Sequence, residues 1–278
     1  MNDLKQYLSV HLKGKYSAAE ITVLKSMILE KLTSLPLTEI LRDENFHLTD
    51  SQFADFKQIV KSLQGNKPIQ YIFEKAYFYG MEFIVNQQVL IPRPETEELV
   101  EWILKENKTA KILDIGTGSG CIAVTLAAKN RDLQLCALDF SKEALKVAQQ
   151  NAEIYNVNIS FLENDILQIP HFEQKWDIIV SNPPYISENE KFTMQKSVVD
   201  FEPHAALFVN EEKPLIFYEK ILQFAKNQLV PNGKIYFEIH KNFGNQMESL
   251  LQQFGFKNIV LKKDISGNDR MIKGEMQE

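Results

Sequence analysis

Strand-like and helix-like segments alternate along the chain from Lys111 onward, and this alternation constrains the fold more than any other feature of the sequence. Short apolar and β-branched runs predict strands at Lys111–Asp114, Gln134–Asp139, Ile159–Glu163, Asp177–Ser181 and Lys234–Ile239. Apolar residues at helical spacing predict helices at Cys121–Lys129, Lys142–Tyr155, Leu215–Leu229 and Phe243–Phe254. Strands that alternate with helices form a mostly parallel sheet with helices on both faces, so we expect an α/β fold.

The last part of the chain departs from this alternation. Two strand-like runs, Ile259–Lys263 and Arg270–Lys273, are joined by Asp264–Asp269 without a helical pattern between them. Parallel strands need a long crossover connection, whereas antiparallel strands can be joined by a short loop. We therefore predict that the mostly parallel sheet carries an antiparallel hairpin at one edge.

Residues 1–74 have a helical pattern of their own. Apolar side chains recur at helical spacing in Ala18–Leu32 and again in Phe53–Leu63. Ser17 stands three residues before Glu20, an arrangement typical of a capping box at the start of a helix. We interpret this region as a small helical bundle.

The segment that follows the bundle predicts a pair of strands. Ala76–Pro92 is rich in aromatic and β-branched residues and is interrupted at Gly80 and at Asn86–Gln88. Pro94 then fits the first position of a helix, because proline needs no hydrogen-bond partner there. We expect a helical domain at 1–74, a β-hairpin linker at 75–93 and an α/β domain at 94–278.

Length and composition exclude several classes of protein. The chain has 278 residues and a formal net charge of −6, whereas proteins that bind bare nucleic acid usually present a basic surface. The first residues lack the pattern of a signal peptide, and no apolar run reaches the roughly 18 residues that span a bilayer. The two cysteines and five histidines have no metal-ligand spacing. We expect a cytoplasmic protein with no metal, no membrane association and no direct nucleic-acid partner.

A glycine-rich loop follows the first strand of the alternating region. The run Ile112–Gly120 reads ILDIGTGSG, and glycine is needed where a tight turn lets the backbone approach a ligand closely. Asp139 ends the next predicted strand, about 20 residues beyond the loop, where an acid accepts hydrogen bonds from ribose hydroxyls. The pattern predicts a cofactor that contains a nucleoside.

The spacing within the loop distinguishes two such cofactors. Dinucleotide-binding loops favour G-x-G-x-x-G, with pyrophosphate at the helix N-terminus. Here the spacing is G-x-G-x-G, and Asp114 would repel a pyrophosphate but suits the ammonium group of an amino acid. We therefore favour S-adenosylmethionine over NAD. Asp165, near the end of the third strand, is expected either beside the adenine or as a solvated loop acid. The remaining predicted cofactor contacts are Asp114, Gly116, Thr117, Gly118, Ser119, Gly120 and Asp139.

The tetrapeptide Asn182-Pro183-Pro184-Tyr185 follows another predicted strand, at the edge of the sheet where ligands bind in α/β proteins. We expect this strand to be the neighbour of the one that ends at Asp114, so that both loops face one crevice. A planar amino group is a poor nucleophile because its lone pair is delocalised. The Asn182 oxygen and a backbone carbonyl fixed by Pro183 would accept its two N–H groups, and Tyr185 would cover it with a flat face. We predict Asn182, Pro183 and Tyr185 as catalytic residues, all four residues as substrate contacts, and Asn182 as a cofactor contact as well.

The connection between residues 186 and 214 is long for a compact domain, and loops of this length are often functional. It contains Phe201-Glu202-Pro203. We expect this loop to form a lid or one wall of the substrate site.

These residues together resemble the release factor-specific glutamine-N5 methyltransferases of the HemK type, and the resemblance spans nearly the whole chain. The tetrapeptide is shared with adenine-N6 and some guanine-N2 methyltransferases, whereas the run Ile91–Glu97 is far more specific. Two positions depart from the family pattern: Ile166 replaces a frequent aromatic residue after Asp165, and His240 replaces a usual glycine. The matching motifs, in the family's order, are Pro68–Tyr71, Ile91–Glu97, the glycine loop, Asn182–Tyr185, Phe201–Pro203 and Gly267–Arg270.

The resemblance implies a Rossmann-like class I methyltransferase sheet with a small N-terminal helical bundle joined by a β-hairpin. It implies that the substrate is the glutamine of a Gly-Gly-Gln motif in bacterial class I release factors, which the helical domain would dock. The glycine loop and Asp139 would hold S-adenosylmethionine, with Asp165 and Ile166 near its adenine. Asn182–Tyr185 would bind the glutamine.

Three other functions fit the sequence less well than this one. A nucleic-acid amino-methyltransferase would use the same tetrapeptide on a flipped base, but it predicts a basic groove that the acidic composition does not favour. A non-catalytic module of the same fold would not need both motifs intact. An NAD oxidoreductase is disfavoured by the loop spacing and by the lack of a proton donor at the predicted crevice.

Overall fold

The computed structural model describes residues 2–43 and 45–277 and divides into two compact units. The first unit comprises Met1–Glu74 together with Gln195–Phe201. The second unit comprises Lys75–Met194 and Glu202–Glu278. The inclusion of Gln195–Phe201 in the first unit was not predicted from the sequence, because this segment lies within the long connection of the α/β region.

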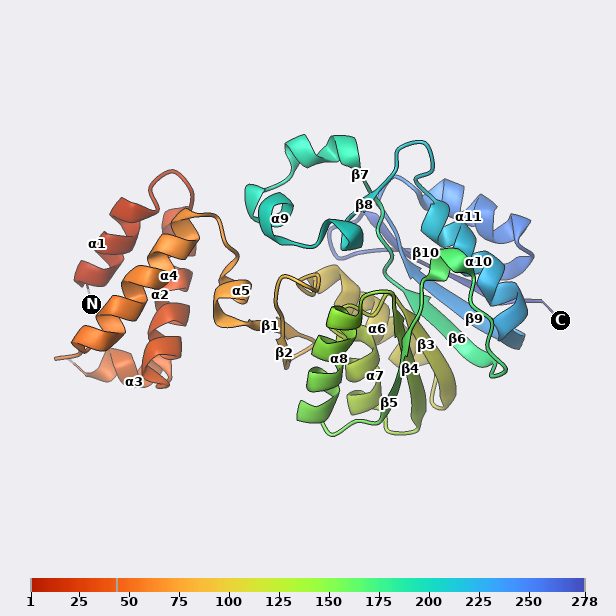
Figure 1. Ribbon diagram of the computed structural model, residues 1–278, viewed down its shortest axis with the longest axis horizontal. Coiled ribbons are helices and arrows are strands. Elements are labelled where there is room, and N and C mark those ends of the chain that lie inside the picture. The colour runs from red at the N-terminus through yellow and green to blue at the C-terminus, as the bar shows by residue number, and fades with distance from the viewer. Residues whose placement is uncertain (1, 44, 278) are drawn as a thin grey trace. The chain divides into compact units, whose positions relative to one another are not determined.

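The first unit is helical (Figure 1). Its core is built from leucine, isoleucine and phenylalanine side chains on α1, α2 and α4. The expected capping box is present at the start of α2, where Ser17 and Glu20 satisfy each other's backbone N–H groups. A second capping box, between Thr49 and Gln52, begins α4. The helices are α1 (Asn2–His11), α2 (Ala18–Thr33), α3 (Leu37–Arg42), α4 (Asp50–Gln64), α5 (Ile69–Phe73) and α9 (Lys196–Phe201).

The second unit is built on a seven-stranded sheet of order β10-β11-β9-β6-β3-β4-β5. The five strands from β9 to β5 run parallel, and β11 pairs antiparallel with both β9 and β10. The predicted α/β sheet with an antiparallel hairpin at one edge is therefore confirmed. The strands are β3 (Ala110–Ile115), β4 (Leu133–Asp139), β5 (Ile159–Glu163), β6 (Trp176–Ser181), β9 (Leu229–Glu238), β10 (Phe256–Lys263) and β11 (Asp269–Met276).

Helices cover both faces of this sheet (Figure 1). Side chains of α6, α7 and α8 pack in one core and those of α10 and α11 in another, while successive sheet residues such as Ile112 and Leu113 contribute to opposite cores. This is the alternation of side chains expected along a strand. The helices are α6 (Pro94–Glu106), α7 (Cys121–Lys129), α8 (Lys142–Ile154), α10 (Ile216–Gln228) and α11 (Gly244–Gln253).

Several predicted boundaries differ from those in the structure, among them the start of β10 at Phe256 and the end of β11 at Met276. The hairpin consists of β1 (Lys75–Phe78) and β2 (Met81–Ile84), so residues 85–92, which the aromatic and β-branched pattern grouped with these strands, are irregular. Strand β9 begins at Leu229 rather than at Lys234, because the pairing of β6 with β9 shifts register between Trp176 and Ile178. A register irregularity lets a strand continue through residues that its sequence pattern would exclude.

The β1–β2 hairpin belongs to the second unit. The backbone of Ile84 donates to Asn151 Oδ1 at 2.7 Å, and the Asn151 side-chain NH2 group donates to Ile84 O at 3.0 Å. The same NH2 group donates to Ser119 O at 2.9 Å, in the glycine loop. One buried asparagine on α8 thus fixes both the hairpin and the loop that follows β3.

Candidate active site

A cavity of about 320 Å³ opens at the carboxyl ends of β3, β4 and β6 in the second unit. This volume lies at the lower end of the range for small-molecule sites, and the position is the one at which α/β sheets bind ligands. Its wall combines polar groups from the predicted motifs with apolar side chains. The motif residues that line it are Gly116, Gly118, Asp139, Asp165, Ile166, Asn182, Pro183 and Pro184.

The glycine loop connects β3 to α7 and follows a path that favours glycine. Gly116 and Gly118 have φ values of 72° and 55°, in the left-handed region. A Cβ atom added to either residue would have no atom within 4 Å, so the backbone has open space beside it. This is the arrangement that lets a ligand approach the main chain closely, and it fits the expected cofactor.

The other predicted residues of the loop do not line the cavity. Asp114 is fully buried, and its Oδ2 accepts a hydrogen bond from Thr117 Oγ1 at 2.6 Å. Burial raises the pKa of the Asp114 carboxyl to about 7. Gly120 lies where an added Cβ would come within 3.0 Å of Ala148 Cβ, so its small size permits close packing of α7 on α8. Asp114, Thr117 and Ser119 are all buried, so these side chains support the loop from the protein interior.

Asp139 lines the cavity and also braces the glycine loop. Its Oδ2 accepts from the backbone N–H of Gly118 at 2.9 Å, and its Oδ1 accepts from that of Ser141 at 2.9 Å. Burial raises the pKa of this carboxyl, while the two backbone hydrogen bonds lower it. Each carboxylate oxygen has a second lone pair, so both can still accept from a ligand hydroxyl.

Asp165 and Ile166 lie together at a third part of the cavity wall. Asp165 caps the short helix η1 (Ile166–Gln168), with its Oδ1 accepting from the backbone N–H of Leu167 at 2.9 Å. The sequence predicts Ile166 near an adenine ring, and Asp165 either beside the adenine or as a solvated loop acid. Both residues line the cavity, and their contact with an adenine ring stays a prediction.

The tetrapeptide begins directly after β6, which is paired with β3 through Ser181 and Ile115. This neighbouring position of the two strands was predicted and is confirmed. Asn182, Pro183 and Pro184 line the cavity. Tyr185 is not part of its wall, and its hydroxyl donates to Glu238 Oε1 at 3.1 Å. The role of its ring as a cover over the substrate stays a prediction.

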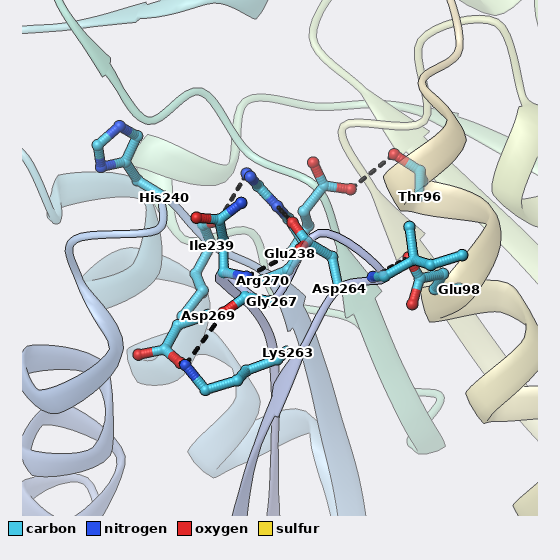
Figure 2. A network of polar contacts seen from close by, with 12 residues as sticks. Thr96, Glu98, Glu238, Ile239, His240, Lys263, Asp264, Gly267, Asp269 and Arg270 are labelled. Atoms are coloured by element: carbon cyan, nitrogen blue, oxygen red, sulfur yellow. Dashed lines mark hydrogen bonds and ion pairs between the residues drawn. The ribbon is translucent and has the colours of Figure 1, made fainter.

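Two buried residues beneath the tetrapeptide were not recognised in the sequence. Thr96 on α6 donates from its hydroxyl to Glu238 Oε2 at 2.6 Å, and the Asn182 side-chain NH2 group donates to Thr96 Oγ1 at 3.3 Å. Figure 2 shows Thr96 and Glu238 facing each other from the helix and the sheet. A signal was present: Glu238 ends β9, the strand next to β6, so its side chain had to lie near the same edge of the sheet.

The long connection between residues 186 and 214 contributes to the cavity wall and is held by an ion pair whose carboxylate is buried. Arg93 Nη2 lies 2.6 Å from Glu202 Oε1, and the backbone N–H of Ile91 donates to Glu202 Oε2 at 3.2 Å. The Glu202 side chain is 1% exposed. Pro203, which follows it, lines the cavity. These contacts tie Ile91 and Arg93 to the segment that contains Pro203.

Comparisons with known proteins first establish the class. The family model described as "Methyltransferase small domain" matches residues 95–204. The structure resembles a ribosomal protein L11 methylase from Lactobacillus delbrueckii subsp. bulgaricus, with a TM-score of 0.51 at 17% identity over 70% of this chain and 84% of that one. It also resembles a methyltransferase from Pyrococcus furiosus, with a TM-score of 0.51 at 18% identity over 83% of this chain and all of that one. The fold and the matched domain are those of an S-adenosylmethionine-dependent methyltransferase.

Full-length relatives then identify the family. The release factor glutamine methyltransferase of Flavobacterium psychrophilum is 46% identical over 93% of both chains. That of Bacteroides thetaiotaomicron is 39% identical over 98% of this chain and 99% of its own. That of Lactococcus lactis is 44% identical over 88% of this chain and 89% of its own. The chain belongs to the release factor glutamine methyltransferase family, and the expected family resemblance is confirmed.

Across residues 2–43 and 45–277, every helix is too short or too polar to span a bilayer.

Proposed function

We propose that this enzyme transfers a methyl group from S-adenosylmethionine to the side-chain amide nitrogen of the glutamine in the Gly-Gly-Gln motif of bacterial class I release factors. The relatives' names support this substrate. The observation that carries the proposal is that Asn182 lines the same cavity as the glycine loop and Asp139. Asn182, which can hold a planar amide, thus shares one cavity with the glycine loop and Asp139, which can hold the cofactor. The reaction would take place in the cytoplasm, where release factors act.

The residues of the site fit such a transfer. When bound, the cofactor supplies an electrophilic methyl group on a positively charged sulfur. Asn182 Oδ1 and the carbonyl of Pro183 would accept the two N–H groups of the substrate amide and hold its nitrogen in line with that methyl. The transfer would form a C–N bond on the substrate amide and break the C–S bond of the cofactor, and the amide nitrogen would lose a proton to water. The methylated nitrogen is cationic and acidic until it loses this proton. Positioning and fixed dipoles therefore suffice without a strong base.

We further propose that the first unit docks the release factor. All the cavity residues belong to the second unit, so the helices of the first unit are not needed to form the cofactor site. An enzyme that acts on a protein substrate needs a surface outside the catalytic cavity to bind that protein. The helices of the first unit provide such a surface.

The proposed substrate can be tested directly with methyl-labelled S-adenosylmethionine. We expect label to enter a purified class I release factor, and to be absent from the same factor with the glutamine of its Gly-Gly-Gln motif replaced by alanine. Duplex DNA and RNA serve as alternative acceptors, because the tetrapeptide is also compatible with an exocyclic base nitrogen. Label in nucleic acid, with none in the release factor, would contradict the proposal and favour the base-modifying alternative.

Asp139 provides a test of the cofactor site. Replacing it by alanine removes the proposed acceptor of the ribose hydroxyls, and charge-assisted hydrogen bonds contribute roughly 1.5–3 kcal/mol. We expect calorimetry to show cofactor affinity lower by about 10- to 100-fold. Because Asp139 also accepts from Gly118, circular dichroism of the variant should confirm that the fold persists. An affinity equal to that of the wild type would mean that Asp139 does not contact the cofactor.

A further inference from the structure

A buried chain of hydrogen bonds lies directly beneath the catalytic tetrapeptide. It runs from the Asn182 NH2 group to Thr96 Oγ1 at 3.3 Å, and from the Thr96 hydroxyl to Glu238 Oε2 at 2.6 Å. The Tyr185 hydroxyl donates to the other oxygen of Glu238 at 3.1 Å. Thr96 is 2% exposed and Glu238 is 1% exposed, so water does not compete for these contacts. Both ends of the tetrapeptide are therefore tied to one carboxylate.

The chemistry of these groups determines which of them donates in each hydrogen bond. A carboxylate can only accept, so the single hydroxyl proton of Thr96 must point toward Glu238. The lone pairs of Thr96 then face Asn182, which can satisfy them only with its NH2 group. An asparagine amide carries oxygen and nitrogen on opposite sides and has nearly the same shape when flipped, so its orientation depends on such partners.

Burial is the largest influence on Glu238 and raises the pKa of its carboxyl. The hydroxyls of Thr96 and Tyr185, which both donate to it, and the charge of Arg270 oppose this shift and favour the charged form. Arg270 is itself fixed, with Nε 3.0 Å from Asp264 Oδ2. Figure 2 shows Arg270 and Asp264 in the same polar network as Glu238. Arg270 thus favours the charged carboxylate of Glu238, which can only accept hydrogen bonds from Thr96 and Tyr185.

We propose that Thr96 and Glu238 are positioning residues that hold the Asn182 amide in the one orientation that presents its oxygen to the substrate. This inference rests on the proposed function, in which Asn182 accepts an N–H group of the glutamine. In the flipped orientation the NH2 group of Asn182 would face the NH2 group of the substrate, donor against donor. Neither positioning residue needs to touch the substrate, since both act through Asn182.

The first test uses the full-length enzyme with Thr96→Val, which keeps the shape of the side chain and removes its hydroxyl. We expect the single-turnover methylation rate to fall by about 10- to 100-fold, the scale of a misplaced reacting group, with cofactor affinity within about three-fold of wild type. Thr96→Ser restores the hydroxyl and should recover most of the rate. Thr125→Val on α7 is the matched control: Thr125 is fully buried, and within the described residues its hydroxyl has no partner. A Thr96→Val rate equal to that of Thr125→Val would overturn the inference.

A double-mutant cycle separates positioning from general structural damage. If Thr96 acts through Asn182, then Thr96→Val should change the rate of an Asn182→Ala enzyme by less than about three-fold, because the oriented group is already gone. Equal losses in both backgrounds would show that Thr96 acts independently of Asn182, and the inference would be wrong.

A third readout needs no substrate and keeps the inference separate from the proposed function. In enzyme labelled with ¹⁵N-asparagine, the Asn182 side-chain signals are identified by their loss in Asn182→Ala. We expect their proton shifts to move upfield in Thr96→Val, through loss of the hydrogen bond, and to stay in place in Thr125→Val. If the wild type fails to methylate a release factor, the proposed function is wrong, while this experiment still decides the inference: unchanged Asn182 signals in Thr96→Val overturn it.

Discussion

Asn182→Ala is expected to lower the rate of methyl transfer by roughly 10²–10³-fold, the scale observed when one preorganised polar group is lost from an active site. The substitution removes the side-chain oxygen that accepts the substrate N–H and leaves the cavity otherwise intact. Cofactor affinity should change much less than the rate, because the glycine loop and Asp139 form other parts of the wall. Single-turnover kinetics and calorimetry measure the two quantities separately.

Asn182→Asp serves as the control, because it keeps an oxygen near the same place. We expect it to retain more activity than alanine and less than the wild type, since the new charge must be desolvated beside the substrate. Aspartate cannot donate to Thr96 Oγ1, so the contact at 3.3 Å is also lost. An alanine variant within a few-fold of the wild-type rate, with a normal fold, would show that the tetrapeptide is only a structural turn.

Arg93→Met is expected to loosen the wall formed by the long connection. It leaves the buried carboxylate of Glu202 without its cation, and breaking a fully buried ion pair costs about 3–5 kcal/mol. The Arg93 side chain is 32% exposed and the backbone N–H of Ile91 still donates to Glu202, so we expect a cost at or just below the lower end of this range. Hydrogen exchange in peptides covering 202–209 should then be faster by on the order of 100-fold, since each 1.4 kcal/mol is a factor of ten. Cofactor affinity should fall as well, because Pro203, Ala205 and Ala206 line the cavity.

Two comparisons distinguish the ion pair from a general effect of losing a charge. Lys105→Met breaks a solvent-exposed pair with Glu101, and it should leave exchange in the same peptides unchanged. The double variant Arg93→Met/Glu202→Gln removes both charges and should exchange more slowly than Arg93→Met alone. If the double variant exchanges as fast as Arg93→Met, or if Arg93→Met matches the wild type, the ion pair does not hold the wall in place.

Much of the second unit could be predicted from local patterns in the sequence. The boundaries of α7 and β5 follow directly from apolar spacing, and the neighbouring placement of β3 and β6 follows from how parallel sheets are wound. The antiparallel hairpin was likewise indicated by the absence of a helix between its strands. The element boundaries and the hairpin are local features, so a short stretch of sequence is enough to specify them.

The contacts around the tetrapeptide could not be predicted in the same way. Thr96 and Asn182 are 86 residues apart in the chain, and Arg93 and Glu202 are 109 apart. Nothing in the local pattern of either member indicates its partner. Thr96 lies within the specific run Ile91–Glu97, near the start of α6, where a threonine has an ordinary structural explanation. Only the packing of α6 over the end of β9 brings its hydroxyl beneath Asn182.

Tandem mass spectrometry of a release factor incubated with the enzyme and deuteromethyl S-adenosylmethionine tests the central claim most directly. The account predicts that the deuterated methyl group is found on the side-chain amide nitrogen of the glutamine in the Gly-Gly-Gln motif, and that Asn182→Ala reduces this product without moving the label elsewhere. Label on any other atom of the release factor, or an equal yield from the Asn182→Ala enzyme, would contradict it.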